Sequence, residues 1–145
     1  MLLGFKRQFA DFVEEGSKMH TIRGKRKIRP KIGETAHCYV DPRQKTMRLL
    51  GRFQVVKVDD IRIEVAWVRG EDSPMNLYIW INDTQLLLDE VNALAWRDGF
   101  RDGRRGNAWE RMACFWRDIH GCKPFVGDLI HWHYKAGTNS SDKSV

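Results

Sequence analysis

The stretch from Gly16 to Arg23 separates a helical pattern from an extended one, and it constrains how the rest of the chain can fold. Before it, apolar residues recur at helical spacing, which predicts an amphipathic helix over Lys6 to Glu15. Gly16 stands where that helix should end, because glycine adopts the left-handed conformation of a helix C-terminus without a steric penalty. Thr21 and Ile22 then indicate an extended segment. Polar side chains therefore gather at a helix-to-strand junction, which we call the junction.

Length and composition fit one globular domain with its own core. The chain has 145 residues, of which 42% are hydrophobic and 30% are charged. No apolar run approaches the roughly 20 residues of a membrane-spanning helix. The apolar start from Met1 to Phe5 is too short for the core of a signal peptide. We therefore expect a cytoplasmic protein with a single domain over residues 1–135 and a small, polar, disordered tail over 136–145.

The basic residues are concentrated in one part of the chain. The net charge is +6, which favours polyanionic partners. Between Lys18 and Lys31 there is no acidic side chain, and guanidinium groups suit bidentate contacts with phosphate. This basic run comprises Lys18, Arg23, Lys25, Arg26, Lys27, Arg29 and Lys31. It predicts binding of a nucleic acid or a nucleotide, with a solvated loop as the alternative.

Alternating apolar and polar residues predict several strands after the junction. A turn at Arg29 to Gly33 precedes them. Strands are expected over Ala36 to Val40, over Leu49 to Val58 and over Ile61 to Val68, with Asp59-Asp60 separating the last two. The segment from Leu77 to Ile81 fits either a strand or the approach to a helix.

Helical spacing returns in the second half of the chain. Asn82-Asp83-Thr84 offers caps for a helix that runs through Trp96 and ends near Asp98-Gly99. Asn107 is expected to cap a further helix, and a closing strand contains Ile130 and Trp132. This order predicts an α+β fold, in which a mostly antiparallel sheet curls into a small barrel flanked by helices.

Four segments of this chain together resemble the ASCH domain, a branch of the PUA-like β-barrel superfamily. The junction, Gly16-Ser17-Lys18-Met19-His20-Thr21-Ile22-Arg23, is similar to the family's G-x-K-x-x-T-x-R signature. The turn Lys31-Ile32-Gly33-Glu34 resembles its entry to a strand, and Ala95 to Phe100 resembles its A-x-x-E-G-F segment. The C-terminal part resembles the family through Phe115-Trp116, His120-Gly121 and the closing strand.

The resemblance implies a small PUA-like barrel with a cationic cleft for RNA or a modified nucleoside. The best-defined enzymes of the family are amidohydrolases that remove the acetyl group of N4-acetylcytidine by means of a lysine, a threonine and a glutamate. These positions fall on Lys18, Thr21 and Asp98, so that aspartate replaces the glutamate. Thr21 would be the nucleophile, Lys18 the base that activates it and Asp98 the proton shuttle, while Arg23 would stabilise negative charge.

The remaining candidates are binding residues, and the enzymatic interpretation has alternatives. Ligand contacts are expected from His20, Arg23, Lys25, Arg26, Lys27, Arg29 and Tyr39, and Trp80 or Trp96 could stack a base. His131 and His133 form half of a metal site at most, with no evident third ligand, so that we expect neither metal nor cofactor. A noncatalytic RNA-binding module and a ribonuclease are the alternatives to an amidohydrolase.

Overall fold

The computed structural model describes residues 1–66, 76–102 and 105–134, which pack into two compact units. The first unit contains Met1–Thr21, Arg26–Val58 and the described part of Ile130–Val145. The second contains Ile22–Lys25 and the described part of Asp59–Leu129. The tail predicted over 136–145 and the end of the strand predicted to reach Val68 lie outside the described residues, and the single domain stays a prediction.

Within the described residues, seven strands form one sheet of an α+β fold, as expected. They are β1 (Leu2–Phe5), β2 (His20–Gly24), β3 (Thr35–Val40), β4 (Arg48–Ala66), β5 (Asn76–Ile81), β6 (Thr84–Gln85) and β7 (Phe125–Trp132). The order is β1-β3-β4-β5-β6, and β7 pairs with β2 and β4. β1 is parallel to β3, whereas the pairs β3–β4, β4–β5 and β5–β6 are antiparallel. Pairings among the described residues do not close this sheet, so the barrel stays a prediction.

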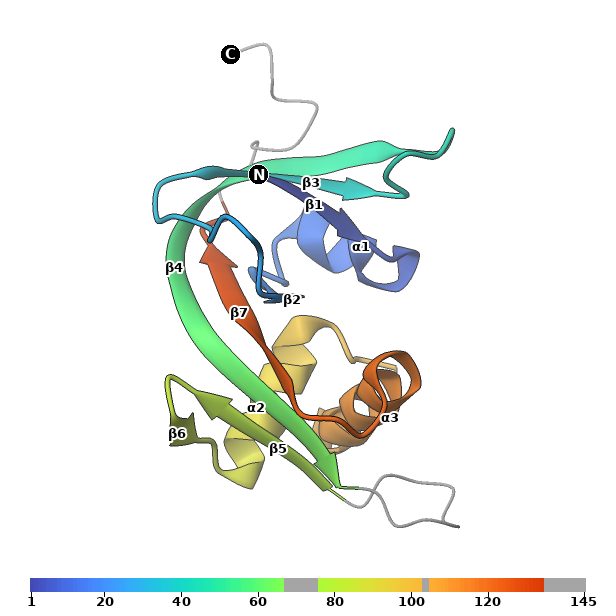
Figure 1. Cartoon of the computed structure of the whole chain (residues 1–145). Helices are drawn as coiled ribbons and strands as arrows, with labels where there is room; N and C mark the ends of the chain where they lie inside the picture. Colours follow the sequence, from blue (N-terminus) through green and yellow to red (C-terminus); the bar gives the residue numbers. More distant parts are fainter. Residues whose placement is uncertain (67–75, 103–104, 135–145) are drawn as a thin grey trace. The chain divides into compact units, whose positions relative to one another are not determined.

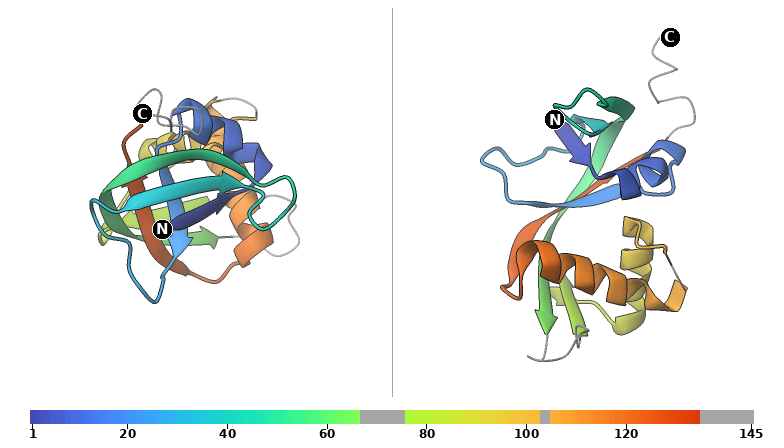
Figure 2. Two further views of the ribbon diagram at one scale, coloured as in Figure 1. Left: turned by 90° about the horizontal axis from the view of Figure 1, so that it is seen from above. Right: turned by 90° about the vertical axis from the view of Figure 1, so that its right-hand side faces the viewer.

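The first unit is built around β3, which lies between β1 and the first half of β4 (Figure 2). Helix α1 (Arg7–Glu15) buries Phe9, Ala10 and Val13 and packs against β3. The helix predicted over Lys6 to Glu15 is thus confirmed. The sequence analysis missed β1, whose few residues carry no alternation long enough to be recognised.

The second unit places helices α2 (Leu88–Asp98) and α3 (Ala108–His120) against β5, with the short 3-10 helix η1 (Arg105–Asn107) between them (Figure 1). Its core combines alternate strand residues with one face of each helix. Its buried members include Ile61, Ile63, Val65, Leu77, Ile79, Val91, Leu94, Phe100, Met112, Trp116 and Leu129. No helix in the described ranges is both long enough and apolar enough to cross a bilayer.

The two strands predicted on either side of Asp59-Asp60 are one strand, β4, so that prediction was wrong. Burial alternates across the aspartates, since Asp59 and Ile61 are buried and Asp60 is exposed. The pair of aspartates signalled a turn by composition alone. Both aspartates lie within β4, where Asn82 donates a hydrogen bond to the Asp59 carboxylate and accepts one from the Asp60 N–H.

Asn82-Asp83-Thr84 does not cap a helix, which corrects a second prediction. Asn82 and Asp83 both have positive φ, 48° and 66°, and they form the tight turn between β5 and β6. Helix α2 begins only at Leu88, where the Glu90 carboxylate accepts a hydrogen bond from the Leu87 N–H. A turn and a helix start favour the same residue types, Asn, Asp and Thr, which explains the error.

Candidate functional site

The junction bends the backbone sharply between α1 and β2. Gly16 ends α1 in the left-handed conformation, with φ of 90°, and a Cβ there would clash with the ring of Tyr134. The Lys18 N–H then donates a hydrogen bond to the Phe12 carbonyl, at 2.9 Å. Lys18 therefore precedes β2 and does not follow the alternation of that strand. Lys18 and Thr21 are both buried, whereas alternation along a straight strand would place them on opposite faces.

Three polar residues of the junction are buried in the first unit. Lys18 is 2% exposed and Thr21 is 4% exposed, and His20 is buried as well. The Lys18 Nζ lies 5.4 Å from the centroid of the Phe9 ring on α1. Lysine is among the residues least often buried, because its ammonium group loses hydration. Such burial is typical of a lysine with a structural or functional role.

His20 is adjacent to a second histidine of the first unit. Its ring centroid lies 6.0 Å from that of His131, with the two planes inclined by 60°. His133 is exposed beyond the end of β7. Over the described ranges, no group of three His, Cys, Asp or Glu side chains is placed to hold a metal ion. His20 and His131 thus form a ring contact between β2 and β7.

Arg23 and Asp98 belong to the second unit, whereas Lys18, His20 and Thr21 belong to the first. Asp98 is the last residue of α2 and is buried. A carboxylate at the end of a helix faces the negative pole of the helix dipole, and burial adds a further cost. Arg23 lies in β2, and a Cβ on Gly127 of β7 would clash with its carbonyl oxygen.

Most of the basic run is exposed in the first unit. The exposed members there are Arg26, Lys27, Arg29 and Lys31. Arg26 donates a hydrogen bond to the Leu2 carbonyl at 3.2 Å, which fixes the direction of its side chain. Tyr39 is half-buried in β3, opposite Leu49 of β4. The exposed cations suit an outer contact with phosphate, whereas Tyr39 is positioned by packing.

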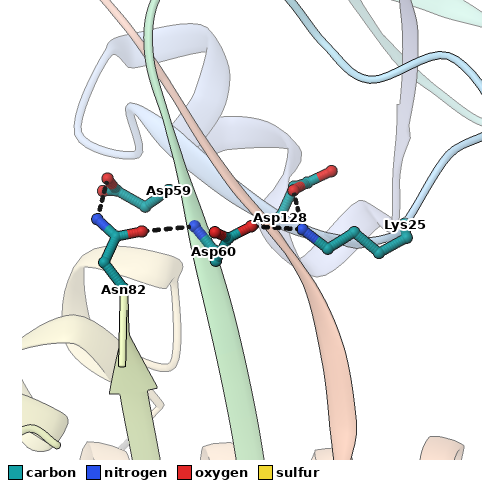
Figure 3. Close-up of polar contacts among 5 residues, drawn as sticks. All are labelled: Lys25, Asp59, Asp60, Asn82 and Asp128. Atoms are coloured by element: carbon teal, nitrogen blue, oxygen red, sulfur yellow. Dashed lines mark hydrogen bonds and ion pairs between the residues drawn. The ribbon is translucent and has the colours of Figure 1, made fainter. Parts of the chain in front are cut away.

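Lys25 differs from the rest of the basic run, because it is bound to two carboxylates of the second unit (Figure 3). Its Nζ lies 2.6 Å from Asp60 Oδ1 and 2.7 Å from Asp128 Oδ1. Asp128 is only 1% exposed, whereas the Lys25 side chain is 43% exposed. These contacts give Lys25 a structural role that joins the end of β2 to β4 and β7. Its predicted role in substrate binding stays a prediction.

Asn82 completes this arrangement from the β5–β6 turn. Its Nδ2 donates to Asp59 Oδ1 at 2.8 Å, and its Oδ1 accepts the Asp60 N–H at 2.9 Å (Figure 3). Its own N–H donates to the Asp60 carbonyl. We call the set of Lys25, Asp59, Asp60, Asn82 and Asp128 the carboxylate clamp.

The carboxylate clamp raises the pKa of its lysine. Burial by itself lowers the pKa of Lys25, but the hydrogen bonds and charges of Asp128 and Asp60 outweigh it, so that the pKa lies above its ordinary value.

The sequence did not predict the carboxylate clamp. The sequence carries one signal for it, namely an aspartate within the otherwise apolar stretch Gly127 to Ile130 of β7.

Comparisons of this chain with protein-family models, curated proteins and solved structures found no match.

Proposed function

We propose that this chain is an ASCH-type domain with a PUA-like barrel that binds RNA or a modified nucleoside and hydrolyses an amide such as that of N4-acetylcytidine. The observation that supports this most is the burial of both Lys18 and Thr21 where the chain passes from α1 into β2. A hydroxyl nucleophile requires a neighbouring base, and a buried amine is a suitable one, because burial disfavours the charged form of an amine.

The reaction follows from these two side chains. Lys18 takes the proton of the Thr21 hydroxyl while the oxygen attacks the acetyl carbonyl carbon. The tetrahedral adduct collapses with cleavage of the C–N bond, the amine leaves with a proton, and water then releases acetate from Thr21. In this proposal Asp98, at the glutamate position of the family, passes the proton to the leaving amine, and Arg23 stabilises negative charge. Each of these roles is testable by its own substitution.

The test is hydrolysis of N4-acetylcytidine by the purified chain, compared with Lys18→Ala and Thr21→Ala. We expect turnover in the unsubstituted chain and its loss in both variants. Lys45→Ala and Thr35→Ala are matched controls, since both residues are exposed in the first unit, and they should retain turnover. Equal turnover in Thr21→Ala would refute the mechanism. If the chain shows no turnover, Asp98→Glu restores the glutamate of the family signature and should create activity.

A second candidate is a noncatalytic RNA-binding module, which the exposed Arg26, Lys27, Arg29 and Lys31 favour. Its affinity for RNA should fall steeply as salt rises, because binding of phosphates releases counterions. That affinity should survive Thr21→Ala, whereas an enzyme would bind its substrate and fail to convert it. Cleavage of the RNA during the same assay would instead indicate the ribonuclease.

A further inference from the structure

One face of the second unit's sheet carries two aromatic side chains beside polar and charged ones. The register places Arg62 of β4 and Gln85 of β6 directly opposite Trp80 of β5, and Glu64 opposite Tyr78. Residues directly opposite in an antiparallel pair share a face of the sheet. These five side chains therefore lie on the same face, which we call the aromatic face.

The aromatic face is turned away from the core of its unit. The alternate residues of the same strands, among them Ile63, Leu77 and Ile79, are buried in the core. Tyr78 is 36% exposed, Gln85 is exposed, and the side chains of Arg62 and Glu64 are both accessible to solvent. Within the described residues, this face therefore offers accessible aromatic surface on a rigid strand.

The geometry of the rings suits flat ligands. The centroids of Tyr78 and Trp80 are 6.3 Å apart, with planes inclined by 44°. The guanidinium carbon of Arg62 lies 4.1 Å from the Trp80 ring, which holds a cation over the aromatic surface. Two rings separated by one residue along a strand are spaced to receive successive unstacked bases, as other sheets that bind single-stranded RNA do.

We propose that the aromatic face binds unpaired bases of single-stranded RNA. Tyr78 supplies a stacking surface, Arg62 with Trp80 supplies a second one, and the Gln85 amide can pair with base edges. Arg62 also forms an ion pair with Glu64 at 4.0 Å, which a phosphate would have to compete with. Glu64 can accept a hydrogen bond from a 2′-hydroxyl, which RNA has and DNA lacks. The net charge of +6 complements a polyanion.

The test measures binding of a fluorescent oligouridylate by polarisation, in the full chain and in Tyr78→Ala and Trp80→Ala. Each substitution should weaken binding about 5- to 100-fold, which is the range for loss of one stacked base. Tyr78→Phe keeps the ring and should retain the affinity. Val126→Ala, at an exposed position of β7 in the same unit, is the matched control and should have no effect. Thermal unfolding of each variant establishes that it is folded.

Unchanged affinity in both Tyr78→Ala and Trp80→Ala would overturn the proposal. Equal affinity for the deoxyribonucleotide of matching sequence would overturn the assignment to RNA. Self-association that is lost in Tyr78→Ala, without any RNA binding, would show that a second copy of the chain occupies the face. The proposal is independent of the amidohydrolase, because none of these substitutions alters Lys18 or Thr21, and each can fail without the other.

Discussion

The junction and the carboxylate clamp both remove polar side chains from water, yet their lysines differ in a way that burial alone does not reveal. Lys18 of the junction is almost completely buried, whereas nearly half of the Lys25 side chain is exposed. Lys25 binds Asp60 and Asp128, which lie on separate strands. These contacts indicate a structural role for Lys25, whereas the proposed mechanism gives Lys18 a role in turnover. We therefore expect Lys18 to matter for turnover and Lys25 for stability.

The largest effect is expected from Lys18→Met, measured as the rate of N4-acetylcytidine hydrolysis. Methionine has similar length but no amine, so that general-base catalysis is lost and the rate should fall about 10²- to 10⁴-fold. The variant should still fold, as followed by thermal unfolding and circular dichroism. Lys18→Arg keeps a positive charge but cannot act as a base, and it should be as inactive. Retained turnover in Lys18→Met would remove the distinction between the two lysines.

Lys25→Met makes the same chemical change at the clamp and should have the opposite result. It removes the cation that faces the buried Asp128 carboxylate. Breaking a buried ion pair costs several kcal/mol and an exposed pair costs little, so this partly screened pair should cost about 1–3 kcal/mol of unfolding free energy. Urea denaturation measures this cost, and turnover should stay within about threefold of the unsubstituted chain. A stable but inactive Lys25→Met would place Lys25 in the site.

The sequence predicted the local elements of both regions better than their contacts. Helix α1 and its end at Gly16 follow from spacing and from the conformational freedom of glycine. The extended segment after Gly16 follows from Thr21 and Ile22, which lie in β2. These features depend on neighbouring residues only, which is why the sequence could predict them.

The carboxylate clamp could not be predicted in the same way, because its members are distant in sequence. Lys25 and Asp128 are separated by 103 positions, and their hydrogen bond exists only through the pairing of strands. From the sequence alone Asp59 was predicted to lie in a turn, because its hydrogen bond from Asn82 joins residues 23 positions apart. Because Lys25 stands in the basic run, the sequence predicted the same ligand-binding role for it as for its neighbours. Its charge is instead matched by Asp60 and Asp128, which are distant from it in the sequence.

Asn82→Gly tests the other half of the clamp and should have a smaller effect than Lys25→Met. Glycine keeps the positive φ of this turn position but loses both side-chain hydrogen bonds, to Asp59 and to the Asp60 N–H. We expect about 1–2 kcal/mol of destabilisation in urea, since net hydrogen bonds contribute about 0.5–1.5 kcal/mol each. Asp83→Gly, at the adjacent position with positive φ, is the matched control and should be nearly neutral. Equal losses in both variants would attribute the effect to the turn and not to the clamp.

The smallest effect is a pH dependence that only the clamp lysine should show. Burial opposes the charge of Lys25, but its two carboxylates raise the pKa above the ordinary value of 10.5. The folded state therefore binds a proton that the unfolded state releases, so this stabilisation is present below about pH 10.5 and is lost as pH rises through the folded-state pKa. The difference in unfolding free energy between the unsubstituted chain and Lys25→Met should shrink over that alkaline range. Taking the difference cancels the titration of the other lysines and the tyrosines. A difference that is constant from pH 8 to pH 12 would mean that Lys25 contributes through packing of its methylenes and not through its charge.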